Sequence, residues 1–320
     1  GAPSPVTGFM AAVAKVGAFA AFLRVFVSTF PTLRADWQPV VWAIAFLSLL
    51  LGAVVALLQR DVKRMLAYSS INHVGFVLVG LEAATARGVS ASLYYVLAYT
   101  FLTIGSFAVV ALVGRPGDLG HDLTDYRGLA ARQPLLAFGF AVLLVAQAGV
   151  PFTTGFLAKF GVVAASIATH GYVISAVAMV SAAVAAFFYL RLVVAMYSPV
   201  GATGDAAAPL DATGAADSGA AVPPAGAPAL AGARSAGPGA MAAEPAPGTA
   251  SRDPATSDGE ITLRALTDEP PPPAVTERGR VPVPPLSALC IAVCVAFSVV
   301  FGIVPGPIVD FAHRATLLFI

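Results

Sequence analysis

Long uninterrupted apolar runs dominate the hydrophobic pattern of the chain. Most of them are close to the roughly 20 residues that a helix needs to cross the hydrocarbon core of a bilayer. The expected spans are residues 6–28, 39–58, 65–81, 91–113, 134–167, 172–197 and 286–304. The pattern therefore predicts an all-α integral membrane protein with about seven transmembrane helices.

The fifth run, residues 134–167, is too long for one simple crossing at a helical rise of about 1.5 Å per residue. Its middle is rich in residues that interrupt helices: proline lacks the backbone donor, and glycine loosens the backbone. The residues expected to form the interruption are Gly149, Pro151, Thr153, Thr154 and Gly155. We predict a discontinuous helix. The two threonines could bond to carbonyl groups that the break frees, or could order water there.

Residues 201–283 have a different composition. Ala, Pro and Gly dominate them, aromatic residues are absent, and they contain ten acidic and five basic residues. Such a segment cannot bury enough apolar surface to offset its ordering entropy, so we predict a disordered tether. The expected organisation is a membrane core at 1–200, the tether at 201–283, and a closing transmembrane helix with a tail at 284–320.

Composition narrows the class of protein further. Hydrophobic residues make up 58% of the chain and charged residues 11%, which excludes an ordinary soluble enzyme. The sequence shows no Lys/Arg-rich face with aromatic side chains for base stacking, so nucleic acid is not an expected partner. No phosphate-binding glycine loop, cysteine cluster or nucleophile elbow is present, so we expect no cofactor and no metal in this chain. Cys290 and Cys294 share one helix face but are too few for a metal or cluster site.

Loop charges predict the orientation. Alternate loops carry more Lys and Arg than the loops between them, and the richer set is expected in the cytoplasm. The richer set contains Arg60, Lys63, Arg64, Arg115, Arg127, Arg132 and the basic residues of the tether; the poorer set contains Arg34, Arg87 and Arg314. Residues 201–283 are therefore predicted to be cytoplasmic.

Two of the three lysines are the first candidates for chemistry. Lys15 lies about ten residues inside the first span, near the bilayer centre, and Lys159 lies in the second half of the broken helix. A lysine at such depth costs several kcal/mol unless it faces a polar interior. Snorkelling to the headgroups fits Lys15 poorly and remains an alternative for Lys159. The acidic residues Glu82 and Asp310 fall at the ends of spans, so neither lysine has an acidic partner at its own depth. The functional interpretation is that each lysine is an unpaired cation that exchanges protons.

His73 is a third candidate, within the polar run 68–75 of the third span. Its imidazole could relay protons, or could simply hydrogen-bond to neighbouring helices together with the serines and Asn72 beside it. The other histidines, His121, His170 and His313, fall in loops or at span ends and are expected at the solvated surface. The tyrosines of the fourth span, Tyr94, Tyr95 and Tyr99, are expected to serve packing.

Four segments together resemble a known family. They are residues 1–6, residues 14–15, residues 63–75 (KRMLAYSSINHVG) and residues 149–160 (GVPFTTGFLAKF). They are similar to the antiporter-like membrane subunits of respiratory complex I. That resemblance implies a fold with two inverted five-helix repeats, each with one broken helix. This chain resembles the last helix of the first repeat, the second repeat, and a closing helix.

The resemblance also implies roles. Lys15 matches the family's central lysine, Lys159 the lysine of the second broken helix on the side where protons leave, and His73 a position on the hydrated axis between them. The implied function is a proton-translocating subunit of NADH:quinone oxidoreductase in the bacterial plasma membrane. NADH, FMN, iron–sulfur and quinone sites are then expected in partner subunits, and the neighbours are other complex I membrane subunits and lipid.

Two alternatives remain open at this point. The first is a subunit of a cation/proton antiporter or a membrane-bound hydrogenase, which resemble the same fold. The second is a structural scaffold subunit of the membrane arm, for which the surroundings of Lys15 and Lys159 would be dry. The family's glutamate–lysine pair has no match here, so we expect it in an upstream part of a longer protein.

Overall fold

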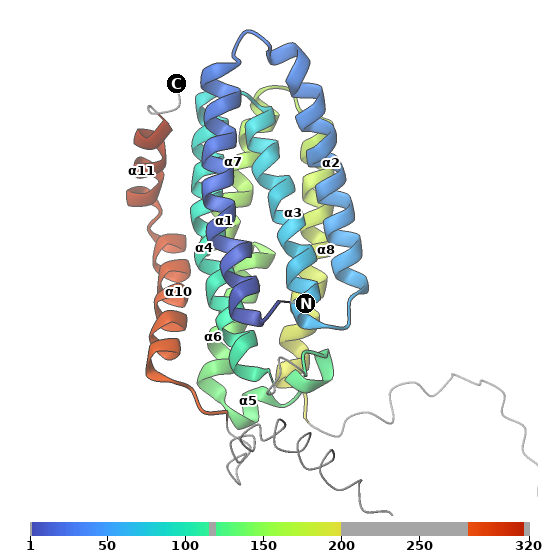
Figure 1. Cartoon of the computed structure of the whole chain (residues 1–320), viewed down its shortest axis with the longest axis vertical. Helices are drawn as coiled ribbons and strands as arrows, with labels where there is room; N and C mark the ends of the chain where they lie inside the picture. The colour runs from blue at the N-terminus through green and yellow to red at the C-terminus, as the bar shows by residue number, and fades with distance from the viewer. Residues whose placement is uncertain (1, 115–119, 200–280, 317–320) are drawn as a thin grey trace, which may run out of the picture. The chain divides into compact units, whose positions relative to one another are not determined.

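The computed structural model describes residues 2–114, 120–199 and 281–316, and these ranges are helical apart from turns and one isolated bridge (Figure 1). The helices are α1 (Ser4–Arg24), continued by the π-helical turn η1 (Val25–Thr29), α2 (Arg34–Leu58), α3 (Val62–Glu82), α4 (Ala86–Val113), the 3₁₀ turn η2 (Leu123–Tyr126), α5 (Leu129–Arg132), α6 (Pro134–Ala148), α7 (Thr154–Ala168), α8 (Tyr172–Tyr197), α10 (Pro285–Ile303) and α11 (Gly306–Thr316). The predicted tether at 201–283 lies outside the described residues, except for its last three.

Five of the described helices are long and apolar enough to cross a membrane: α1 with η1, α2, α4, α8 and α10. Helices α6 and α7 have 15 residues each and are too short alone. Together they form the predicted discontinuous helix. Helix α3 has 21 residues but carries the polar run of His73. The all-α, multi-span prediction is confirmed.

Some boundaries differ from the expectation. Helix α2 begins at Arg34, so Pro39 is its sixth residue and lies inside the helix, where one intrahelical donor is missing. Helix α4 begins at Ala86, where the Thr85 side chain caps its first turn. The tail after α10 contains a further helix, α11, with Pro307 in its first turn.

Helix α3 packs against α2, α4, α7 and α8, so its polar run lies inside the bundle (Figure 1). Glycines permit the close approach of α2. A Cβ atom on Gly52 would lie 2.8 Å from Cα of Asn72, and one on Gly75 would lie 2.8 Å from the backbone nitrogen of Leu49. The Asn72 amide also donates a 2.9 Å hydrogen bond to the Leu49 carbonyl. Small residues and a polar bond together hold this pair of helices.

The prediction of a solvated His121 is wrong. The loop before α5 folds back on the turn between α2 and α3: Val62 N donates to His121 O at 2.7 Å, and Leu123 N donates to Arg60 O at 3.0 Å. This pairing buries His121, whose ring lies 3.4 Å from the Ser4 hydroxyl. Sequence position placed His121 in a polar loop, but only tertiary pairing showed that the loop is covered.

Candidate functional site

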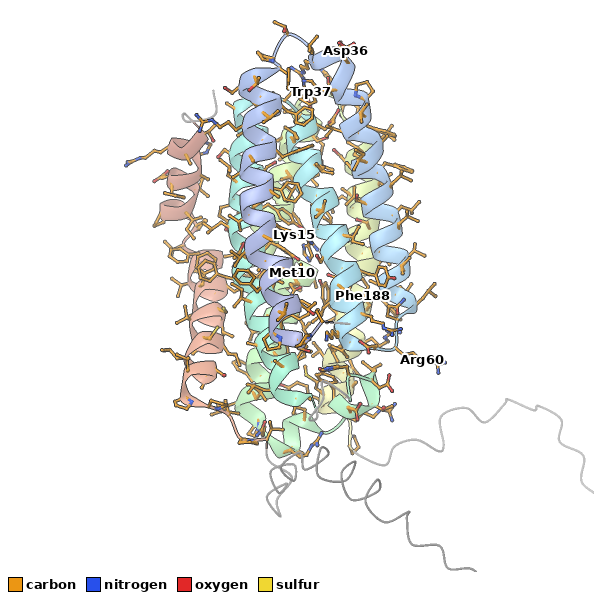
Figure 2. All side chains as sticks on the ribbon, in the orientation of Figure 1. Met10, Lys15, Asp36, Trp37, Arg60 and Phe188 are labelled. Carbon is orange, nitrogen blue, oxygen red and sulfur yellow. The ribbon has the colours of Figure 1, made fainter. Side chains whose placement is uncertain are left out.

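Lys15 is directed from α1 into the bundle (Figure 2). Its ammonium group donates hydrogen bonds to the Ser70 hydroxyl and, at 3.3 Å, to the Ser70 carbonyl oxygen. It also lies 5.6 Å from the centre of the Tyr99 ring, within the range of a cation–π contact. The Lys15 ammonium group is therefore held by polar and aromatic groups of α3 and α4.

Lys159 is more deeply buried, with 7% of its surface exposed. Its ammonium group donates to the carbonyl oxygens of Gln147 at 2.9 Å and Ala148 at 2.8 Å, the last two residues of α6. A helix C-terminus carries unpaired carbonyl groups and a partial negative charge, which stabilise a cation. The snorkelling alternative is thus wrong for Lys159: its charge is held at the helix break.

The geometry of the break explains its glycines. Gly149 ends α6 at φ +91°, in the left-handed region, and a Cβ there would lie 3.0 Å from Cδ of Lys159. A Cβ on Gly155 would overlap the carbonyl oxygen of Ala146, so glycine lets the start of α7 approach the end of α6. Pro151 lies in the exposed turn between the two helices. The two short helices are thereby placed so that Lys159 of one reaches the other.

The two threonines stabilise the start of α7. The Thr153 hydroxyl donates to the Val150 carbonyl at 2.7 Å and accepts from Phe156 N at 3.4 Å. It therefore bonds to one carbonyl group and one amide group at the break. Bonding to a freed carbonyl group is one of the two roles predicted for these threonines. The Thr154 hydroxyl donates to the Ser298 hydroxyl of α10 at 3.4 Å.

His73 is buried and hydrogen-bonded at both ring nitrogens. Nδ1 lies 2.8 Å from the Tyr95 hydroxyl, and Nε2 lies 3.1 Å from the Tyr189 hydroxyl. The Tyr189 hydroxyl donates its one proton to Oε1 of Gln147 at 3.0 Å, so toward His73 it can only accept. Nε2 of His73 is then the protonated nitrogen, and Nδ1 accepts from Tyr95. The bonds select one neutral tautomer.

Gln147 joins this network to the second lysine. Its side-chain amide donates to the Ser106 hydroxyl at 2.7 Å and accepts from Tyr189, while its backbone carbonyl accepts from Lys159. On the other side, Lys15 and His73 both line a cavity of about 10 Å³, which has room for about one water molecule. Hydrogen bonds thus link His73 to Lys159, and the small cavity lies between His73 and Lys15.

Several members of this chain were not predicted. Tyr189 of α8 and Gln147 of α6 connect His73 to Lys159, and Tyr95 bonds to His73 although it was expected only to pack. Ser70, one of the serines expected to bond to a neighbouring helix, accepts from Lys15. Gln147 is the single amide side chain in the apolar run 134–167, which is a signal that could have found it. Tyr189 gave no such signal, because its role depends on α8 facing α3.

Carboxylates are absent from this centre within the described ranges. Neither lysine forms an ion pair with a described residue, and Glu82 lies at the end of α3, where it accepts from Gln38 at 3.2 Å. An unpaired buried cation is costly, and in membrane proteins such groups mark ion or proton pathways. The fold and site together define a multi-pass membrane protein with titratable cations in its interior.

Comparison with known proteins gives the family. Residues 1–185 match the family model of the NADH:quinone oxidoreductase/Mrp antiporter transmembrane region, and the chain belongs to this family. A curated relative, NADH-quinone oxidoreductase subunit N of Rhodococcus opacus, is 50% identical over 197 residues. The match covers 62% of this chain and 36% of the relative, so the chain spans little more than a third of that relative.

Solved structures agree on the fold. A chain of respiratory complex I from Thermus thermophilus aligns with a TM-score of 0.63 at 24% identity, covering 97% of this chain and 52% of that chain. A chain of the Mrp complex from Dietzia aligns with a TM-score of 0.64 at 19% identity, covering 93% of this chain and 50% of that chain. The antiporter-like helical fold predicted from the sequence is confirmed.

Proposed function

We propose that this chain is part of a proton-translocating membrane subunit of NADH:quinone oxidoreductase, of the subunit N type. Protons pass between Lys15 and Lys159, with His73 as the titratable group between them. The observation that carries this proposal is the hydrogen-bonded chain from His73 through Tyr189 to Gln147, which ends at the turn that holds Lys159. The curated relatives support it by name.

The break couples the charge of Lys159 to the rest of the chain. When Lys159 carries a proton, its ammonium satisfies the carbonyls of Gln147 and Ala148. When it loses that proton, the last turn of α6 loses its charged donor. The same turn carries the Gln147 side chain, which orients Tyr189 and through it His73. A change of charge at Lys159 is therefore transmitted to the tautomer and orientation of His73.

Electron transfer is assigned to other subunits. NADH, FMN, iron–sulfur clusters and quinone are proposed to bind in partner subunits, and neighbouring membrane subunits of complex I are the proposed contacts of this chain. Redox changes there would act here as electrostatic changes along the membrane arm. They would shift the proton affinities of the two lysines in turn.

The test replaces each lysine in the complete complex. Lys15→Met and Lys159→Met are expected to reduce NADH-driven proton uptake into membrane vesicles by at least tenfold, measured by fluorescence quenching. Lys63→Met is the matched control, because it removes the third lysine, at the start of α3. Unchanged proton uptake in both interior variants would refute the proposal and favour the scaffold alternative.

The remaining alternative is a subunit of a cation/proton antiporter or a membrane-bound hydrogenase. The identity of 44–50% to curated subunit N proteins favours complex I. Affinity purification of the full chain separates the two. Co-purification of NADH-oxidising, quinone-reducing activity supports complex I, whereas sodium or potassium exchange for protons without NADH supports an antiporter.

A further inference from the structure

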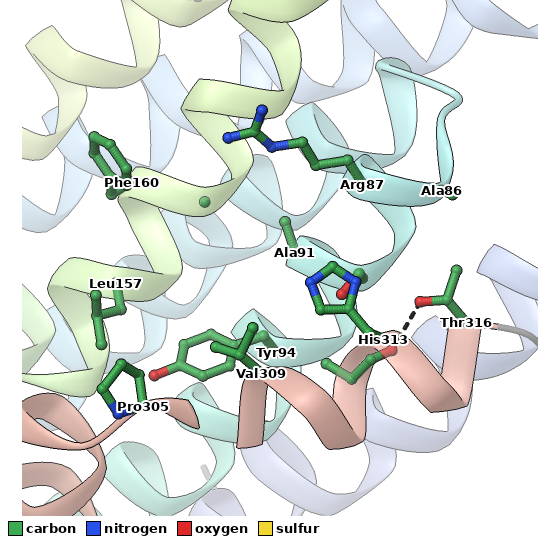
Figure 3. A pocket seen from close by; sticks show the side chains of 13 residues that line it. Ala86, Arg87, Ala91, Tyr94, Leu157, Phe160, Pro305, Val309, His313 and Thr316 are labelled. Atoms are coloured by element: carbon green, nitrogen blue, oxygen red, sulfur yellow. Dashed lines mark hydrogen bonds between the residues drawn. The ribbon is translucent and has the colours of Figure 1, made fainter. Parts of the chain in front are cut away.

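A second feature of the bundle lies away from the lysines, in a cavity of about 690 Å³ between α4, α7 and the segment from Pro305 through α11 (Figure 3). Its walls are mainly apolar and include Leu157 of α7 and Val309 of α11. Its volume is in the range of sites that take an organic ligand of drug size. Nothing in the proton-transfer chain uses this cavity.

One end of the cavity is basic. Arg87 and His313 line it from α4 and α11, and both side chains extend into the space between the helices (Figure 3). Neither forms a hydrogen bond or an ion pair with the residues that the structure describes. The first turn of α4 lines the same end, and a helix N-terminus favours negative charge. This end is suited to an anion.

The basic end lies at the depth of lipid headgroups. Helix α4 has 28 residues and is therefore about 42 Å long, against about 30 Å for the hydrocarbon core of a bilayer. Arg87 is the second residue of α4, so it lies beyond the hydrocarbon core when the helix spans it. Phosphate groups of lipids occupy this level.

Deeper in the cavity is a hydroxyl group with no partner. Tyr94 is 5% exposed and lines the cavity, and its hydroxyl has no hydrogen-bond partner among the described residues. A buried hydroxyl without a partner is costly, which points to an acceptor on a ligand. Tyr94 follows Arg87 by seven residues, so the two lie about 10 Å apart along α4.

We propose that this cavity binds an anionic phospholipid. The phosphate contacts Arg87 and His313, an ester carbonyl accepts from the Tyr94 hydroxyl, and an acyl chain follows the apolar wall past Leu157 and Val309. The basic end of the cavity, the Tyr94 hydroxyl deeper along α4 and the apolar wall match, in that order, the phosphate, the ester carbonyl and the acyl chain of such a lipid. The proposal is independent of proton transfer.

The test measures lipid bound to the full chain, purified in detergent and equilibrated with equal amounts of anionic and zwitterionic phospholipid. Native mass spectrometry reports the bound species. Arg87→Gln is expected to lower anionic lipid occupancy about fivefold, the effect of one basic residue near an anionic lipid. Arg314→Gln is the matched control, because Arg314 is exposed beside His313 but does not line the cavity.

A second variant tests the apolar wall without changing charge. A Cβ on Gly161 would lie 3.5 Å from Cβ of Ala91, an ordinary contact, and Gly161 lines the cavity, so Gly161→Leu is expected to extend a side chain into it. Both it and Tyr94→Phe should lower occupancy, with unchanged helix content by circular dichroism.

Three outcomes would overturn the proposal. The first is equal lipid binding by Arg87→Gln and Arg314→Gln. The second is displacement of the lipid by inorganic phosphate alone, which would indicate an anion site. The third is protection of the cavity by a neighbouring protein subunit, seen as failure of a Gly161→Cys variant to react with a lipid-soluble maleimide in the intact complex after detergent has removed bound lipid.

Discussion

Replacing Tyr189 with phenylalanine is the sharpest test of the hydrogen-bonded chain. The change removes one oxygen and keeps the ring, which packs against Phe188. That oxygen bonds to His73, Gln147 and Ser69. Interhelical hydrogen bonds in membrane proteins contribute about 0.6 kcal/mol each on average, so the loss of three costs about 2 kcal/mol of stability.

The functional loss should exceed the loss of stability. Without the hydroxyl, Nε2 of His73 has no acceptor and Oε1 of Gln147 has no donor, so the neutral tautomer of His73 is no longer selected. We expect NADH-driven proton uptake per assembled complex to fall at least tenfold. The amount of complex should fall less, and unfolding in detergent should occur a few degrees lower, as scanning fluorimetry would show.

The control is Tyr172→Phe, which makes the same substitution at an exposed position where, among the described residues, the hydroxyl bonds to His170 alone. It should leave both proton uptake and unfolding temperature unchanged. If Tyr189→Phe lowers the unfolding temperature but leaves uptake per complex at the wild-type rate, Tyr189 is structural and the coupling through Gln147 is wrong.

Further predictions concern the helix break. Gly155→Ala should sharply reduce the amount of folded protein, because the new methyl group would overlap the carbonyl oxygen of Ala146; Gly161→Ala on the same helix should be tolerated. Thr153→Ala removes the cap of α7 and should cost about 1 kcal/mol, lowering the unfolding temperature in scanning fluorimetry. The same change at Thr169, after the end of α7, is the control. Equal effects of Gly155→Ala and Gly161→Ala would refute the close approach at Gly155. Equal effects of Thr153→Ala and Thr169→Ala would refute the role of Thr153 as the cap of α7.

The sequence singled out the three titratable residues of the proposed site but not the residues that connect them. Lys15, Lys159 and His73 stand out in the sequence because each is costly in an apolar run, and that cost needs no tertiary information. Their partners do not stand out in the same way. Ser70 and Tyr95 are ordinary residues of membrane helices until the packing of α1, α3 and α4 brings Ser70 against Lys15 and Tyr95 against His73.

The sequence by itself determined the class of protein, the approximate limits of most of its apolar helices, and the position of the helix break. These follow from local physics: the length of apolar runs against bilayer thickness, and the backbone properties of Gly149 and Pro151. Tertiary structure alone decided how the buried charges are satisfied. The carbonyls that hold Lys159 become available because α6 ends where it does and Gly155 lets α7 approach it, which depends on contacts across the break.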